Sequence, residues 1–238
     1  MRILITNDDG MMAEGLVPLI RLCRKYGEVT AFVPKYEQSG KSHSIEIHKP
    51  FEAKKVELAE DVKVWAVDSS PADCVRLAVL GMKMDFDLVI SGINRGFNIG
   101  VDIQYSGTAG AALEAATLGI NALAISTPPE YYPDAIEHFD RVFNFLFDNK
   151  FFELNNIYNV NIPKDPKEIR ITHQGSAYYS DEFEHLGDNM YMPCGVCVHK
   201  DTGDLTLDTD AVINGYISVT PISTSRTNMD VYRKLTDI

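Results

Sequence analysis

The sequence is poor in cysteine and in positive charge. Four cysteines in 238 residues are too few for a disulfide scaffold, and we therefore expect the reducing compartment of the cytoplasm. Lys and Arg number 22 against 34 Asp and Glu, which gives a net charge of −12 and a pI near 4.9. This charge would repel the phosphates of a nucleic-acid polymer and an anionic membrane surface. A small phosphorylated ligand held by a local cation is not excluded.

The sequence also has no long apolar run. A membrane span needs about 18 or more apolar residues, and Glu114 interrupts the best candidate, residues 109–125. The apolar run at residues 3–5 is too short for the core of a signal peptide, and the acidic residues Asp8 and Asp9 follow soon after it. We therefore expect neither a membrane partner nor export.

Short β-branched runs alternate with segments that carry apolar residues at helical spacing. The expected strands are Ile3–Thr6, Glu28–Val33, Val62–Val67, Leu88–Ser91, Ala122–Ser126 and Tyr158–Ile162. The expected helices are Glu14–Tyr26, Pro71–Gly81, Thr108–Gly119 and Asp134–Asp148. This alternation predicts an α/β fold of the Rossmann-like, three-layer α/β/α type, with a mainly parallel sheet and helices on both faces.

The pattern changes after about Pro163, where tyrosines and glycines are scattered among short apolar runs. We expect hairpins and an arm there. The predicted organisation is a single domain over residues 1–238, with a Rossmann-like core at about 1–165 and a C-terminal hairpin and oligomerisation extension at about 166–238. We expect a homodimer or a homotetramer.

Oxygen-bearing side chains follow three of the expected strands. Residues 7–10 with the pair Asp8-Asp9 follow the first, residues 34–44 with Gln38-Ser39-Gly40 follow the second, and residues 91–100 with several serine and asparagine side chains follow the fourth. Ligands of open α/β sheets gather outside the carboxyl ends of the strands, and these oxygen donors suit a hard cation such as Mg²⁺ or Mn²⁺. The alternative is that Asp9-Gly10 forms a hairpin turn, although the helical spacing that follows favours a turn from strand to helix.

A second candidate is the segment Ser106-Gly107-Thr108, where a glycine-rich loop runs into a helix. The N–H groups at a helix N-terminus bind phosphate. The alternative is that Ser106 or Thr108 is an ordinary N-cap. The segment lacks the spacing of a Walker loop.

Several blocks of sequence share the order and spacing of one known family. They are residues 3–10, 37–44, 71–75, 91–98, 105–108, 159–163 and 215–221. Together they resemble the stationary-phase survival protein SurE family of nucleotidases over nearly the whole chain.

The resemblance implies a Rossmann-like fold, a C-terminal part used in dimerisation, and metal-dependent hydrolysis of nucleoside monophosphates. It implies one divalent cation per subunit, Mg²⁺ or Mn²⁺, with the ligands Asp8, Asp9, Ser39 and Asn94. It also implies a phosphate pocket made by Asn94, Ser106, Gly107 and Thr108. We expect Asp8 to be catalytic by orienting or deprotonating the attacking water, and direct attack by Asp8 remains an alternative.

Other residues carry less certain roles. His43 and Asn98 are candidates for a loop that contacts substrate, and an exposed His43 without a role is equally compatible with the sequence. The chain departs from the family at Ser69-Ser70, where Gly-Thr is common, and at residues 191–195, where a Tyr-Trp-Leu-Gly-Gly stretch is frequent.

Two functions of other classes stay open. A noncatalytic nucleotide-sensing module would keep the phosphate turn without needing both acids. A thiol redox protein would act through Cys194 and Cys197, although these cysteines lack the helical context of a thioredoxin-like motif.

Overall fold

The structure is a computed structural model that describes residues 1–236. Its centre is a nine-stranded sheet in the order β3-β4-β2-β1-β5-β6-β7-β11-β8, and a separate two-stranded hairpin pairs β9 with β10. The strands are β1 (Arg2–Thr6), β2 (Glu28–Pro34), β3 (Ala53–Val56), β4 (Lys63–Val67), β5 (Leu88–Arg95), β6 (Asn121–Thr127), β7 (Ile157–Asn161), β8 (Ile169–Ile171), β9 (Tyr179–Gly187), β10 (Met190–Cys197) and β11 (Ile217–Pro221).

Helices alternate with strands along the chain, as the pattern predicts, and the last helix follows the last strand. They are α1 (Leu16–Cys23), α2 (Pro71–Arg76), α3 (Gly107–Thr117), α4 (Tyr132–Asp148), α5 (Asp208–Ile213) and α6 (Met229–Thr236). A π-helical turn, η1 (Leu77–Gly81), extends α2, and 3₁₀ turns form η2 (Gly100–Tyr105), η3 (Pro129–Tyr131) and η4 (Phe151–Glu153). All six predicted strands and all four predicted helices are therefore confirmed, with shifted ends.

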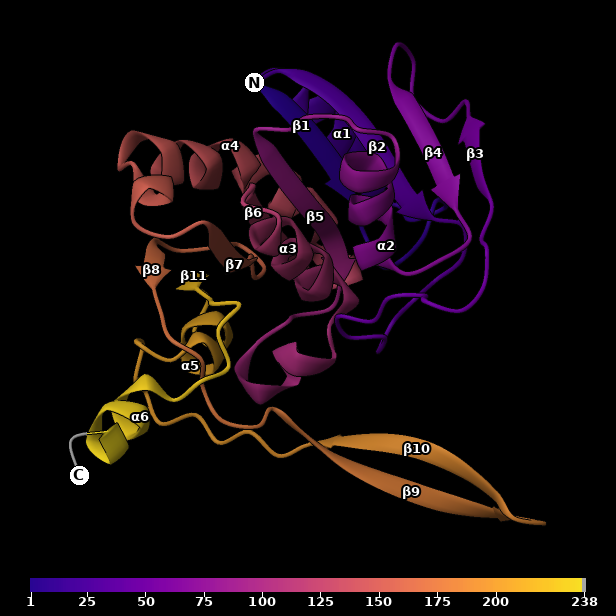
Figure 1. Cartoon of the computed structure of the whole chain (residues 1–238). Helices are drawn as coiled ribbons and strands as arrows, with labels where there is room; N and C mark the ends of the chain where they lie inside the picture. Colours follow the sequence, from indigo (N-terminus) through magenta and orange to yellow (C-terminus); the bar gives the residue numbers. More distant parts are fainter. Residues whose placement is uncertain (237–238) are drawn as a thin grey trace.

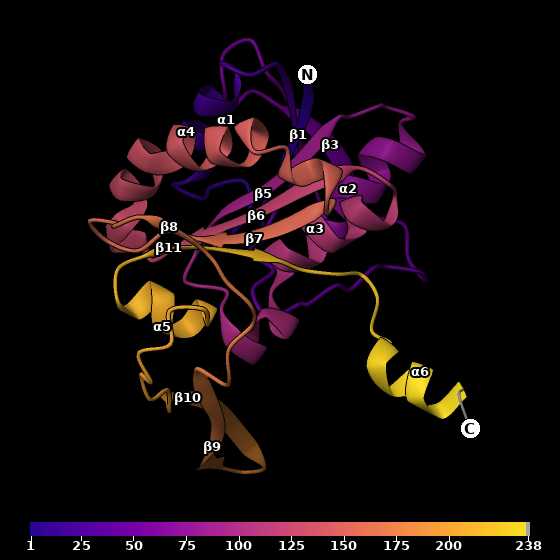
Figure 2. The ribbon, with the colours of Figure 1, turned by 90° about the vertical axis from the view of Figure 1, so that its left-hand side faces the viewer.

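Helices cover both faces of the sheet. Figure 2 shows α1 and α4 on one side of the strands and α2 and α3 on the other. Two separate apolar cores result. One packs α1 and α4 against the sheet with Leu19, Ile20 and Phe139, and the other packs α2 and α3 with Val75, Ala111 and Ala115. The three-layer α/β fold is confirmed.

The sheet is mainly parallel, with two exceptions. β1 pairs in parallel with β2 and β5, and the parallel pairing continues through β4 on one side and through β6 and β7 on the other. β3 runs antiparallel to β4, and β11 runs antiparallel to β7. The carboxyl ends of β1, β2 and β5 therefore meet at one edge of the sheet, where the candidate residues follow them.

The chain after residue 165 both rejoins the sheet and leaves it. β11 inserts between β7 and β8, so that Ile217 and Val219 are fully buried. The predicted arm is the β9–β10 hairpin, which projects from the body in Figure 1. The proposed boundary near residue 165 stays a prediction.

Candidate metal and phosphate site

The two acids lie in the turn that leads from β1 into α1. The side chain of Asn7 closes this turn, since its Nδ2 donates to Gly10 O at 3.0 Å and its Oδ1 accepts from Gly10 N at 3.1 Å. Gly10 has a φ of +87°, which favours glycine. The turn therefore joins strand to helix, and the alternative of a hairpin at Asp9-Gly10 is wrong.

Asp8 is buried against the start of α3. Asp8 is only 3% exposed. The Thr108 hydroxyl donates a hydrogen bond to Asp8 Oδ1. A Cβ at Gly107 would lie 2.8 Å from the Cβ of Asp8, so glycine is required for this approach. Burial raises the pKa of Asp8 above its usual range, and the hydrogen bond from Thr108 opposes that rise.

Asp9 is half-buried beside the end of β5. Its Oδ2 accepts a hydrogen bond from the backbone N–H of Arg95 at 2.9 Å. Burial, followed by the charge of Asp8, raises the pKa of Asp9 to about 6, and the Arg95 N–H opposes this rise. The charge of Arg95 does not offset the rise in the pKa of Asp9, so a cation bound between the two neighbouring carboxylates would stabilise their charged forms.

Asn94 lies at the end of β5 and is 8% exposed. Its Nδ2 donates to Gly96 O at 2.7 Å, which fixes the amide and leaves its oxygen as the atom that suits a cation. The pairing of β5 with β6 is irregular between Ser91 and Asn94. Such irregularities re-aim side chains at the ends of strands.

Ser39 lies on the exposed loop that follows β2. The loop approaches Asp8 through the backbone N–H of Gln38, which donates to Asp8 O at 2.7 Å. The Ser39 hydroxyl itself donates to Glu37 Oε1 at 2.8 Å. The structure thus brings the loop to the acids but pairs the Ser39 hydroxyl with Glu37, a residue that the sequence analysis missed. Its carboxylate also raises the pKa of Asp9.

These donors fit a hard divalent cation. The predicted ligands are two carboxylates, one hydroxyl and one amide oxygen, and hard cations prefer such oxygen atoms. Across residues 1–236, no three or more His, Cys, Asp or Glu side chains cluster as a metal site. The fit therefore depends on Ser39 and Asn94 as much as on the acid pair, and the ligand set stays a prediction.

The predicted phosphate turn is the N-terminus of α3. Ser106 is its N-cap, because its Oγ accepts from the N–H of Ala109 at 3.0 Å. Ser106 is 7% exposed and Thr108 is fully buried. The structure confirms the capping interpretation of Ser106. It also places an eleven-residue helix with its positive end against Asp8, where an anion bound near the acids would meet it.

Asn98 and His43 both have partners within the protein. Asn98 is 8% exposed. Its Nδ2 donates to Ser126 Oγ at 2.8 Å, and its backbone oxygen accepts from Asn159 and Asn161. His43 Nε2 lies 2.7 Å from Glu114 Oε2. A direct contact of either residue with substrate stays a prediction.

The cysteine pair lies far along the arm. Cys194 and Cys197 are exposed free thiols on β10, an antiparallel strand rather than the start of a helix. Cys74 is buried in α2, and burial raises the pKa of its thiol, which makes it a poor nucleophile.

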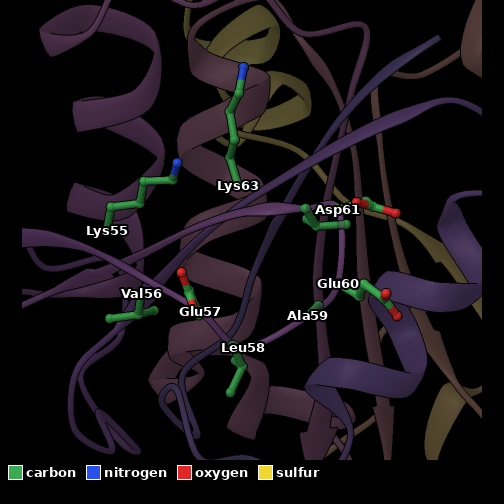
Figure 3. A pocket seen from close by; sticks show the side chains of 9 residues that line it. Lys55, Val56, Glu57, Leu58, Ala59, Glu60, Asp61 and Lys63 are labelled. Atoms are coloured by element: carbon green, nitrogen blue, oxygen red, sulfur yellow. The ribbon is translucent and has the colours of Figure 1, made fainter.

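Hollows of the surface border the site on two sides. One of about 230 Å³ is lined by Asp9, Arg95 and Glu37 together with apolar Met12 and Tyr132. Another, of about 840 Å³, includes Ser106 and His43 in its wall. The hollow in Figure 3 is lined by residues 55–63, from the end of β3 to the start of β4, and none of the candidate residues lines it.

No helix within residues 1–236 is long and apolar enough to cross a membrane.

Comparison with known proteins extends over almost all of the chain. The family model described as "Survival protein SurE" matches residues 3–181. A protein named 5′-nucleotidase SurE from Thermosipho melanesiensis is 38% identical, with 99% of this chain and 96% of the relative covered. A protein of the same name from Natranaerobius thermophilus is 37% identical, with 100% and 98% covered.

A solved structure has the same fold. The crystal structure of the SurE protein from Aquifex aeolicus matches with a TM-score of 0.83 and 30% identity, over 100% of this chain and 99% of that one. The similarity therefore includes both the sheet and the C-terminal part.

Proposed function

This chain belongs to the survival protein SurE family, and from this membership we propose that it is a 5′-nucleotidase. The relatives that cover the full length carry that enzyme's name. The proposed reaction is the metal-dependent hydrolysis of a nucleoside monophosphate to a nucleoside and phosphate.

One contact carries the proposal, namely that between the acid pair and the N-terminus of α3. The Thr108 hydroxyl donates to Asp8, and Gly107 lets the helix approach the carboxylate closely. Hydrolysis of a phosphate monoester needs a positive charge to balance the phosphate oxygens. It also needs hydrogen-bond donors that stabilise the charge that develops on those oxygens in the transition state. The acid pair would hold the cation, and the start of α3 would supply the donors.

Asp8, Asp9, Ser39 and Asn94 would hold one Mg²⁺ or Mn²⁺ per subunit. When bound, such a cation supplies polarisation of a phosphate oxygen and of a water molecule. The half-buried Asp9 is held by Arg95 N–H and the amide of Asn94 by Gly96 O. These bonds fix the ligands before any cation arrives, and they lower the cost of ordering the site.

Asp8 is the proposed base. Its raised pKa makes it a better proton acceptor than an exposed aspartate, and Thr108 fixes the orientation of its carboxylate. Ser106, Gly107 and Thr108, with Asn94, would bind the phosphate oxygens. Direct attack by Asp8 would instead form an aspartyl phosphate as the nucleoside leaves, and water would then hydrolyse this intermediate to phosphate. A substrate made chiral at phosphorus separates the two routes, because one displacement inverts the configuration and two displacements retain it.

The proposal includes the assembly and the compartment. We infer a homodimer or homotetramer in the cytoplasm, with nucleoside monophosphates as small-molecule substrates. The charge of −12 supports the absence of nucleic-acid polymers among the partners.

The test is release of inorganic phosphate from a panel of 5′- and 3′-nucleoside monophosphates in the presence of Mn²⁺. We expect the 5′ substrates to be hydrolysed. We expect the Asp8→Asn variant to turn over substrate at least about 10²-fold more slowly than the wild type. The matched control is the double variant Cys194→Ser, Cys197→Ser on the arm, which should keep full activity. Activity that depends on the cysteines and survives Asp8→Asn would refute the proposal.

A further inference from the structure

Glu114 is a buried carboxylate outside the proposed ligand set. It lies on α3, the helix whose N-terminus forms the phosphate turn, and is 5% exposed. Its Oε2 pairs with His43 Nε2 at 2.7 Å, and its Oε1 accepts from Arg76 Nη1 at 2.9 Å. The hydrogen bond with His43 lowers the pKa of Glu114 despite burial, and Arg76 adds to that effect. A buried charge with two short partners is held in one position.

The partner His43 belongs to the segment that carries Ser39. Residues 38–44, here called the Ser39 loop, form neither helix nor strand. The loop is attached to the body at both ends. Gln38 N donates to Asp8 O at one end, and at the other Ser42 N donates to Tyr105 O at 3.0 Å and Ser42 Oγ donates to Gln104 O at 2.6 Å. The next residue, His43, forms the hydrogen bond with Glu114. The other attachments of the loop go to backbone oxygens, whereas this one goes to a buried carboxylate.

The backbone of the Ser39 loop lies directly on α3. A Cβ at Gly110 would come within 2.4 Å of Ser42 O and 2.9 Å of the Cα of His43. Glu114 lies four residues further along the same helix, so it lies on the same face as Gly110. The side chain of His43 therefore runs along α3 toward Glu114.

We propose that Glu114 is a positioning residue that holds the Ser39 loop through His43. One helix then sets three parts of the site relative to each other: the phosphate turn at its start, its contact with Asp8, and the loop that brings Ser39 to the acids. This proposal rests on the proposed metal site, because Ser39 matters only if it is a ligand. Losing a residue that orients a metal ligand typically costs about 10–100-fold in metal affinity or activity.

The experiment uses Glu114→Gln and His43→Gln in the full chain. A glutamine at 114 keeps the volume of the side chain but loses the charge and one of two acceptor oxygens. Free Mn²⁺ measured by electron paramagnetic resonance gives the dissociation constant without an activity assay. Hydrogen exchange of residues 38–44 reports the attachment of the loop itself.

We expect both variants to bind Mn²⁺ about 10–100-fold more weakly and to exchange faster in the Ser39 loop. Saturating Mn²⁺ should restore most of kcat, since the acids and the phosphate turn are intact. The double variant should be no weaker than either single variant, because both remove the same attachment. A purely structural role would lower stability and leave the Mn²⁺ requirement unchanged.

Asp140→Asn is the matched control. Asp140 also accepts two short hydrogen bonds, from Lys25 at 2.7 Å and Tyr26 at 2.8 Å, but it lies on α4. Its variant should leave both the dissociation constant and the exchange of the loop at wild-type values. An equal effect of Asp140→Asn would overturn the proposal.

Wild-type affinity and wild-type exchange in both test variants would also overturn it. If Glu114→Gln does not fold, His43→Gln decides, because the side chain of His43 is 23% exposed. A wild-type chain that binds no Mn²⁺ would refute the proposed function instead, and the hydrogen exchange would still decide whether Glu114 fixes the loop.

Discussion

Asp8 and Asp9 are neighbours in sequence, but the fold gives them different surroundings. Asp8 points to the N-terminus of α3, and Asp9 to the backbone of Arg95. The sequence predicts that both acids follow a strand. It could not show that Thr108, one hundred residues away, supplies the hydrogen bond that opposes the rise in the pKa of Asp8.

Asp9→Asn should stabilise the metal-free protein at pH 8. Because the pKa of Asp9 is about 6 in the fold and 3.8 as its ordinary value, ionised Asp9 costs stability above pH 6, and this cost disappears as the pH falls toward 4. After allowance for the partial exposure of the side chain, the expected gain is about 1–2 kcal/mol. Urea unfolding in EDTA measures it.

In the same variant, Mn²⁺ should no longer raise the free energy of unfolding as it does in the wild type. An Asp9→Asn protein that is less stable than the wild type in EDTA, or equally stabilised by Mn²⁺, would contradict the placement of Asp9.

Thr108→Val should lower turnover of all nucleoside monophosphates alike. Valine keeps the shape of threonine but removes the hydroxyl donor that fixes the orientation of the buried Asp8 carboxylate. We expect a loss on the order of 10–100-fold in kcat/KM. Thr108→Ser keeps the hydroxyl and should retain most of the activity. A loss confined to one base would show that Thr108 contacts the nucleoside.

At the scale of elements, the sequence predicts the helices and strands that have a clear local pattern of apolar residues. The strands of the core are buried apolar runs, and β1, β2, β5 and β6 were found because such runs have a recognisable composition. β3 gives no such signal because it is short and half of its residues are lysines, and β8 gives none because it has only three residues.

Long-range contacts could not be predicted from these patterns. The pairing of Glu114 with His43 joins residues 71 positions apart, and no local signal in the sequence links a loop histidine to one face of a helix. The insertion of β11 between β7 and β8 is likewise a property of topology.

Gly110→Ala tests the packing between α3 and the Ser39 loop. Alanine favours a helix over glycine by about 0.5–1 kcal/mol, but its Cβ would lie 2.4 Å from Ser42 O and would displace the loop. We expect weaker Mn²⁺ binding without loss of helix content, measured by the same resonance titration and by circular dichroism. Gly119→Ala is unsuitable as a control because of its φ of +78°. Ala116→Gly, on the same helix, serves instead.

At the scale of the whole molecule, the β9–β10 arm exposes many apolar side chains to solvent. Figure 1 shows β9 and β10 extending away from the body. Its exposed apolar side chains include Tyr179, Phe183, Leu186, Met190, Tyr191, Met192 and Val196. A two-stranded hairpin is only marginally stable alone, and a second subunit would cover this surface at modest cost.

We therefore expect sedimentation at about 10 µM, a concentration at which oligomers with apolar interfaces persist, to give at least twice the subunit mass of 26.6 kDa. The double substitution Phe183→Asp, Met192→Asp should shift the protein toward monomers, because buried unpaired charges oppose association. A wild-type protein that is strictly monomeric and fully active would contradict the role of the arm.

The central claim is that the acid pair and the start of α3 form a metal-dependent phosphatase site. The most direct test is phosphate release from one 5′-nucleoside monophosphate by the wild-type protein, before metal stripping, after stripping with EDTA, and after addition of Mg²⁺ or Mn²⁺. The account predicts that stripping abolishes turnover and that Mg²⁺ or Mn²⁺ restores it, whereas undiminished turnover in EDTA would contradict it.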